Sequence, residues 1–197
     1  MKKASLVLSL VALGALTGCS LFGGTKVSVE KFQEAVDKIE EHTYTKATVS
    51  YKIDMKGTGL YEDSTEKASG KIEYTYDADS KTWKTDSSDK HADDYKYDLY
   101  SIRGMKFTNS GNQEDENLKT TTTYYTNPLK VTQTIKGETT VLGVTTKVDG
   151  TYTYTFDKYG FVTKCTTKSN TSTEGGSSGI SVSGTSKGTE SFTVSYK

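Results

Sequence analysis

Few residues of this chain could act as nucleophiles, general bases or metal ligands. Its 197 residues include two cysteines, Cys19 and Cys165, and two histidines, His42 and His91. Nucleophilic catalysis needs a nucleophile, a base and an orienting group in contact, and neither histidine stands in a motif of this kind. The sequence also has no phosphate-binding glycine loop and no Cys/His metal spacing. We therefore expect a protein that is not an enzyme and that uses no metal or cofactor.

Two acidic segments could offer oxygen ligands to calcium, one at 77–80 (DADS) and one at 86–94. Asp77 and Asp79 lack the third carboxylate, the glycine and the distant glutamate of a calcium-binding loop. Because Asp is common in turns and solvated loops, we predict a turn and a loop here. In the second half of the chain, Cys165 is predicted to be a small buried residue beside tyrosines, and a reactive thiol is the alternative.

Cys19 ends an apolar stretch close to the N-terminus. Lys2 and Lys3 precede an uncharged run at 6–16, which is too short to span a bilayer and has the order of a secretory signal. The four residues at its end, LTGC at 16–19, resemble the lipobox of bacterial lipoproteins. This resemblance implies cleavage before Cys19 and attachment of a diacylglyceryl group to its sulfur.

The lipobox resemblance divides the chain into a signal peptide (1–18), a lipidated cysteine with a short linker (19–27) and one extracytoplasmic domain (28–197). A residue such as Cys19 with two or three acyl chains stays on a membrane, because each buried methylene contributes about 0.8 kcal/mol. The spacer at 20–25 reaches at most about 20 Å, so the domain would lie close to the bilayer. The expected location is the outer side of the cell membrane of a one-membrane bacterium, with an outer membrane as the alternative.

The charge composition is balanced, with 25 Lys and Arg against 25 Asp and Glu. Charges alternate in sign along the chain, and no basic block is longer than two residues. This pattern excludes nucleic acid as an expected partner and gives no indication of an acidic membrane surface as one. One proline, 14 tyrosines and many Thr, Ser and Gly residues favour strands and turns over helices.

An amphipathic helix is predicted at 29–41. Ser28 is placed as its N-cap, and Val29, Phe32, Val36 and Ile39 recur on one face at three- and four-residue spacing. We expect this apolar face of the helix to cover a sheet, and binding of a partner is the alternative.

From Ala47 onward, apolar and polar residues alternate, which predicts antiparallel strands with one buried and one wet face. The same alternation at 95–99 predicts a strand. Asp149-Gly150 predicts a two-residue hairpin turn, and the turn after it would pair Tyr152 with Cys165. The segment at 166–191 is rich in Ser, Thr and Gly, which indicates either a mobile loop or a weak edge hairpin.

The apolar phase of these strands is rich in aromatic residues. Ring area combined with hydroxyl groups suits an acyl chain, a polyketide or the face of a sugar, although the same face could simply be the core under the helix. The candidate ligand-lining residues are Tyr51, Ile53, Ile72, Tyr74, Tyr76, Trp83, Tyr152, Tyr154 and Phe156.

The chain is similar to a group of bacterial lipoproteins, those whose fold resembles LolA, LolB, LprG and LppX. The features that carry this resemblance are the lipobox, the short spacer, the amphipathic helix and the long Tyr/Thr strands with turns at 76–77 and 156–160. The resemblance implies an open half-barrel whose concave face holds acyl chains. The residue pattern itself predicts a mainly β protein (α+β), with a large curved antiparallel sheet packed against an N-terminal amphipathic helix.

We therefore expect a membrane-anchored extracytoplasmic lipoprotein that binds a lipid or another apolar ligand. The alternative is a non-catalytic cell-surface protein with an interaction or structural role. The sequence names no protein partner for either function.

Overall fold

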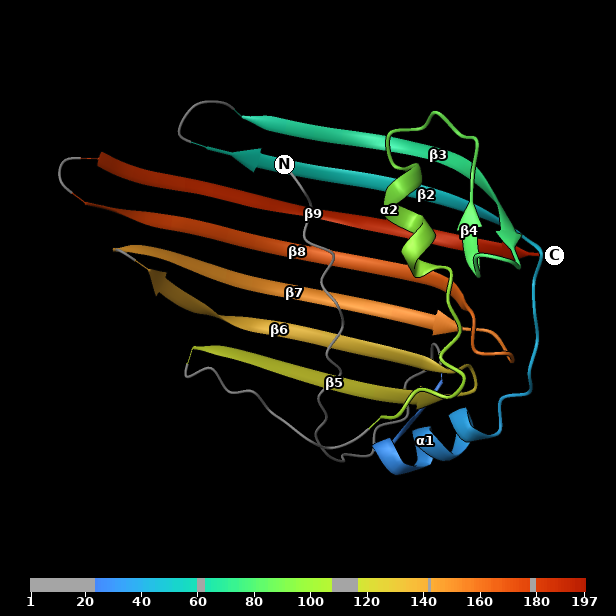
Figure 1. The fold of residues 1–197 in the computed structure, drawn as a ribbon. Coiled ribbons are helices and arrows are strands. Elements are labelled where there is room, and N and C mark those ends of the chain that lie inside the picture. The colour runs from blue at the N-terminus through green and yellow to red at the C-terminus, as the bar shows by residue number, and fades with distance from the viewer. Residues whose placement is uncertain (1–23, 60–62, 108–116, 142, 178–179) are drawn as a thin grey trace.

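A computed structural model describes residues 24–59, 63–107, 117–141, 143–177 and 180–197. Nine strands form one open sheet in which all neighbours are antiparallel, in the order β1-β5-β6-β7-β8-β9-β2-β3-β4 (Figure 1). The strands are β1 (Thr25–Val27), β2 (Lys46–Thr58), β3 (Ser64–Asp77), β4 (Thr82–Lys84), β5 (Leu118–Thr126), β6 (Lys130–Val141), β7 (Val144–Phe156), β8 (Val162–Ser177) and β9 (Ile180–Tyr196). The helices are α1 (Val29–Asp37), α2 (Ala92–Tyr95) and the short 3-10 helix η1 (Lys96–Asp98). The predicted fold class, a large antiparallel sheet with an N-terminal amphipathic helix, is confirmed.

Helix α1 begins where the sequence predicts. The Ser28 hydroxyl accepts a hydrogen bond from the Lys31 amide at 3.4 Å, which caps the helix. The helix buries Val29, Phe32 and Val36 against the sheet and ends at Asp37, four residues before the predicted end at 41. The prediction that the apolar face of this helix covers the sheet is therefore confirmed.

The segment at 166–191 lies at the centre of the sheet, so the expected loop or edge hairpin is wrong. It forms most of β8 and β9, which pair with each other and are flanked by β7 and β2. Strand pairing uses backbone groups that Ser, Thr and Gly have as fully as apolar residues do. Neighbouring strands on both sides therefore hold a segment whose own sequence has little strand preference.

The predicted turn at Asp149-Gly150 is also wrong, because both residues lie inside β7. The β6–β7 hairpin instead turns next to Gly143, whose φ is +78°. This register pairs twelve residues on each strand, from Lys130 with Thr155 to Val141 with Val144. Such a long ladder outweighs the local preference of an Asp-Gly pair for a turn.

The next hairpin also differs from the prediction. Tyr152 lies opposite Thr167, and Tyr154 lies opposite Cys165, two residues away from the predicted pairing. An irregularity between Thr155 and Phe156 shifts the register there. The alternation of faces is kept, so the tyrosines remain on the predicted side.

Residues 95–99 form no strand. They belong to α2, η1 and the loop that follows, which cross one face of the sheet (Figure 1). Tyr95 and Leu99 are buried while Tyr97 is 68% exposed, because a spacing of four residues puts the first two on the same side of a helical turn.

The sheet has two unlike faces. The covered face is the one that α1, α2 and the loop at 99–107 pack against, and its central row runs through Tyr124, Val131, Tyr154, Cys165, Phe192 and Tyr51 on adjacent strands. The open face is formed by the alternate strand residues, which are mostly Thr, Ser and Lys. All described elements and the whole described core lie within 24–197, so a chain that starts at Ser20 contains the fold.

Candidate functional site

The covered face of the sheet is the candidate site, because it joins aromatic area to a few polar groups. Among the described strand residues that point to it, Glu66 and Glu190 are the only charged ones. A largely apolar surface with a small number of placed polar groups is the usual character of a ligand site.

The structure gathers the nine predicted ligand-lining residues on this face, but most of them serve the core. Five are buried, and Trp83 and Tyr154 are partly buried against that core. Tyr76 and Tyr152 are half-buried. The five buried residues are Tyr51, Ile53, Ile72, Tyr74 and Phe156. Side chains packed in this way reach a ligand only after the helices or loops above them move.

Polar ends of these aromatic side chains hold the segment at 86–107 on the sheet. The Tyr74 hydroxyl donates to the Ala92 carbonyl at 2.7 Å, and the Trp83 indole donates to the Leu99 carbonyl at 2.7 Å. The Tyr51 hydroxyl donates to the Asp89 carboxylate, also at 2.7 Å. Burial, with the Asp89 carboxylate beside it, raises the pKa of Tyr51 to about 12, so this donor keeps its proton.

A cluster of tyrosines and carboxylates lies where η1 meets the sheet. The Tyr95 hydroxyl donates to Glu190 Oε1 at 3.0 Å, and the Tyr154 hydroxyl is a hydrogen-bond partner of Asp98. Burial and the charge of Glu190 raise the pKa of Asp98 to about 7. One carboxyl of this cluster therefore changes charge near neutral pH, inside a mainly apolar surrounding.

Cys165 is part of the same cluster and is 4% exposed. Burial and the nearby Asp98 charge raise the pKa of its thiol to about 12, which leaves almost no thiolate at neutral pH. The prediction of a small buried residue beside tyrosines is confirmed.

Sequence reasoning missed Asp98 and Glu190. Glu190 gave one signal, since it interrupts the apolar phase of β9 that continues through Phe192, Val194 and Tyr196. No signal in the sequence pointed to Asp98, because the residues around it belong to strands that are distant in the sequence.

The sequence placed His91 in a charged loop, yet its side chain is only 4% exposed. Its Nδ1 lies 3.1 Å from Asp94 Oδ2 and its Nε2 lies 3.5 Å from Glu66 Oε1. The ring packs against Tyr51 with centroids 5.2 Å apart. This histidine thus joins α2 to β3. His42 is exposed; its ring stacks on Tyr159 at 4.0 Å and lies 4.4 Å from Tyr44, measured between ring centroids.

The covered face continues past the helices toward the far ends of the long strands (Figure 1). Six of its apolar side chains there are half-buried, namely Met55, Ala68, Leu118, Ile135, Val148 and Tyr152, whereas Val141 at the end of β6 is 63% exposed. We call these six residues the apolar stripe. Tyr152 lies over Gly150, where a Cβ would meet its ring at 3.5 Å. A Cβ at this distance would be in ordinary van der Waals contact with the ring.

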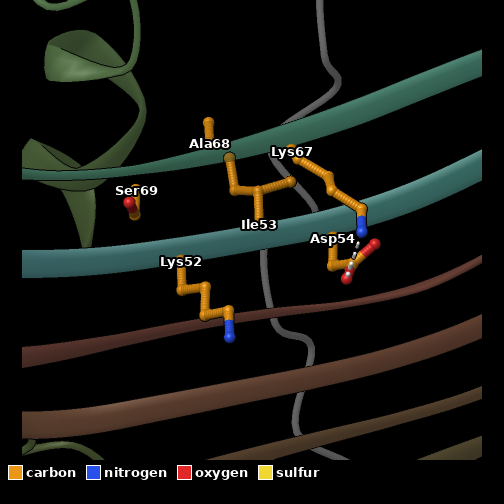
Figure 2. A pocket seen from close by; sticks show the side chains of 6 residues that line it. All are labelled: Lys52, Ile53, Asp54, Lys67, Ala68 and Ser69. Carbon is orange, nitrogen blue, oxygen red and sulfur yellow. Dashed lines mark ion pairs between the residues drawn. The ribbon is translucent and has the colours of Figure 1, made fainter.

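A hollow of about 340 Å³ is lined by residues of the paired strands β2 and β3 (Figure 2). Lys52, Asp54, Lys67 and Ser69 supply its polar side chains and belong to the open face. Lys67 Nζ lies 3.6 Å from Asp54 Oδ2. A hollow bordered by charges in this way suits a polar ligand better than an acyl chain.

The acidic segment at 77–80 is a turn, whereas the segment at 86–94 is a loop only as far as His91 and then enters α2 at Ala92, so the predicted loop is wrong for 92–94. The Asp77 carboxylate accepts hydrogen bonds from the Asp79 and Ser80 amides at 3.0 and 3.3 Å, which confirms the predicted turn. In the part of the chain that the structure describes, no group of three or more His, Cys, Asp or Glu side chains could hold a metal ion.

Cys19, the predicted lipid attachment residue, lies outside the described residues. Among the residues that are described, no helix combines the length and apolar character needed to cross a bilayer. The roles of the residues above are inferred from their own contacts. No protein-family model, no curated protein and no solved structure matches this chain.

Proposed function

We propose that the protein is a membrane-anchored extracytoplasmic lipoprotein that binds a lipid or another apolar ligand on the covered face of its sheet. The observation that supports this best is the contrast between the two faces. Under the helices the covered face holds aromatic and aliphatic side chains, and it carries two carboxylates in all; toward the far ends of β8 and β9 it carries mainly Ser, Thr and Gly. The open face is almost entirely polar throughout. A ligand with acyl chains would lie along the apolar stripe, beyond the helices.

The cluster of Asp98, Glu190, Tyr95 and Tyr154 would meet the polar end of such a ligand. Its hydroxyls and carboxylates lie at the inner end of the apolar stripe, next to Tyr152 and Ile53 in the same rows of the sheet. A surface with apolar side chains and with polar groups at one end orients an amphiphile, because its head group gains hydrogen bonds only in one direction.

The anchor is tested by replacing Cys19. We expect Cys19→Ser to move the protein from the membrane fraction to the soluble fraction of the exported material when the membranes are washed at about 500 mM salt, because no acyl chain can then be attached and surface charges are screened. Mass spectrometry of the wild-type N-terminal peptide should show a cysteine with attached acyl groups. An unmodified Cys19 in the membrane-bound wild type would contradict the anchor.

The ligand site is tested by placing a charge on the apolar stripe. We expect Ile135→Glu to abolish binding of a fluorescent acyl-chain probe, because a carboxylate there would be desolvated by the bound chain. Thr134→Glu is the matched control, since Thr134 is the neighbouring residue on the open face of the same strand. Equal binding by both variants would remove the covered face as the site, as would a wild-type protein that neither binds the probe nor co-purifies with lipid.

The alternative is a non-catalytic surface protein with an interaction or structural role. It is favoured by the far parts of β6 to β9, where hydroxyl side chains join neighbouring strands, such as Thr140 and Thr145 at 2.8 Å. A stoichiometric protein partner recovered from cells by crosslinking, in place of a lipid, would support this alternative.

A further inference from the structure

The open face concentrates positive charge in a chain whose overall charge is balanced. Its described strand residues include fourteen lysines and six carboxylates. The lysines are Lys26, Lys46, Lys52, Lys56, Lys67, Lys71, Lys84, Lys119, Lys130, Lys136, Lys147, Lys164, Lys168 and Lys187. The carboxylates are Asp54, Glu73, Asp77, Glu138, Asp149 and Glu174. The other described residues carry nine cationic and fifteen acidic side chains, so the molecule is strongly dipolar.

This arrangement corrects the conclusion drawn from composition, which gave no indication of an acidic membrane surface as a partner. Lysines that alternate with apolar residues within each strand all point away from the core. The sheet then places these strand faces side by side, and their charges add.

Ion pairs neutralise only part of the open face. Lys136 Nζ lies 3.1 Å from Asp149 Oδ2, and Lys147 Nζ lies 3.5 Å from Glu174 Oε1 and 4.0 Å from Glu138 Oε2. Lys67 pairs with Asp54 and Lys84 pairs with Asp77. Lys130 Nζ lies 4.0 Å from the centroid of the Tyr125 ring. Nine other lysines and one carboxylate, Glu73, lie outside these pairs.

Two lysines face each other directly, since Lys56 on β2 is the cross-strand partner of Lys187 on β9. Like charges at opposite positions destabilise a sheet. The pair is unfavourable for the isolated protein and becomes favourable when an anionic surface covers it.

The residue types of the open face indicate broad electrostatic contact. Among its described strand residues, Tyr125 is the only aromatic or aliphatic one, so nothing else there would insert into an apolar phase. All its cations are lysines, whereas the chain's one arginine, Arg103, pairs with Glu41 elsewhere. Arginine grips single phosphates in a fixed geometry, while lysine acts as a mobile point charge.

We propose that the open face docks on the anionic lipid headgroups of a bilayer, with the covered face turned away from it. Nine strands span about 40 Å, and the lysines are spread over all nine of them. A linear polyanion would touch one stripe of this surface, whereas a plane of headgroups would touch all of it. The choice of a membrane rests on the proposed function, because the Cys19 anchor would keep a bilayer within reach.

The test uses the unlipidated chain that starts at Ser20 and vesicles containing about 30% phosphatidylglycerol in phosphatidylcholine, for which each lysine near the surface contributes about 1 kcal/mol. We expect binding at about 50 mM salt that is lost at about 500 mM salt, where the Debye length is only a few ångströms. Vesicles of phosphatidylcholine alone should bind no protein. Replacing Lys52, Lys56, Lys168 and Lys187 together by glutamine should weaken binding by at least about 100-fold.

The matched control replaces four lysines on the covered side by glutamine, which gives the same net charge: Lys31 and Lys38 at α1, Lys96 in η1 and Lys106 in the loop at 99–107. This control should bind within about threefold of the wild type, since the lost charges lie away from the docked face. Equal weakening of the two variants would overturn the proposal, as would binding to soluble polyphosphate without binding to vesicles. Circular dichroism of both variants establishes that they are folded.

The proposed lipid anchor and the proposed docking of the open face can be contradicted independently of each other. If Cys19 carries acyl chains but the soluble domain binds no anionic vesicles, the docking is wrong and the anchor stands. If Cys19 is unmodified while the domain binds these vesicles through its lysines, the docking stands and the anchor is wrong.

Discussion

Phe32→Ala is expected to lower the free energy of unfolding by about 3–5 kcal/mol, which is the usual cost of deleting a fully buried phenylalanine. The Phe32 side chain has no exposed surface. Its ring lies 5.1 Å from Phe107 and 4.9 Å from Tyr124, measured between ring centroids. It thus joins α1, the loop at 99–107 and β5, and its loss opens a cavity between three parts of the chain.

Urea denaturation followed by the fluorescence of Trp83, the single tryptophan, measures this effect. Phe32→Leu keeps most of the apolar volume and should cost less than about 1.5 kcal/mol. Tyr97→Ala, at a position 68% exposed, should change stability by no more than about 0.5 kcal/mol. A loss below about 1 kcal/mol for Phe32→Ala would mean that α1 is not packed on the sheet as described.

Asp98→Asn is expected to stabilise the protein at pH 8 by as much as about 4 kcal/mol and to leave its stability at pH 4 nearly unchanged. Burial and the Glu190 carboxylate raise the pKa of Asp98 to about 7 in the folded state, whereas an unfolded aspartate has a pKa of about 4. Asparagine keeps the size of the side chain and a hydrogen-bonding group for Tyr154.

The sign of this pH dependence follows from proton binding. Below about pH 4 the carboxyl is protonated in both states, so it contributes no pH-dependent difference. Between about pH 4 and pH 7 the folded state binds the proton and the unfolded state does not, so stability falls as the pH rises. Above about pH 7 the charge is buried in the folded protein and the full cost is present.

The difference between variant and wild type, measured by urea denaturation from pH 4 to pH 8, isolates this residue from other titrating groups. Asp86→Asn is the matched control, because Asp86 is an exposed aspartate in the charged loop. Its difference from the wild type should stay within about 0.5 kcal/mol over this range. A flat difference for Asp98→Asn would show that Asp98 is not desolvated.

The sequence predicted the local features of the fold well. The two-residue alternation from Ala47 onward identified strands with one buried face. Helix α1 was identified from its N-cap, Ser28, and from the apolar face formed by Val29, Phe32 and Val36. These features depend on residues a few positions apart, so their physical causes lie within the segment itself. The same alternation correctly placed Tyr154 and Cys165 on the apolar side.

Predictions failed where distant strands decide the outcome. Asp149-Gly150 has the chemistry of a turn, but the long β6–β7 ladder holds it within a strand. The 166–191 segment has little strand preference, but β2 and β7 flank it. Tyr95 and Leu99 alternate as in a strand, but they pack on the sheet from a helical crossover.

By itself, the sequence determined the fold class, the helix and the side of each strand that faces the core, because these follow from residue spacing along one segment. It also carries the predicted lipobox at Cys19. Only the tertiary structure decided that Asp98 meets Glu190 and that lysines from distant strands share one face. The first depends on how η1 docks on the sheet. The second depends on the pairing between strands, which is set by the sum of many backbone contacts and by no single stretch of residues.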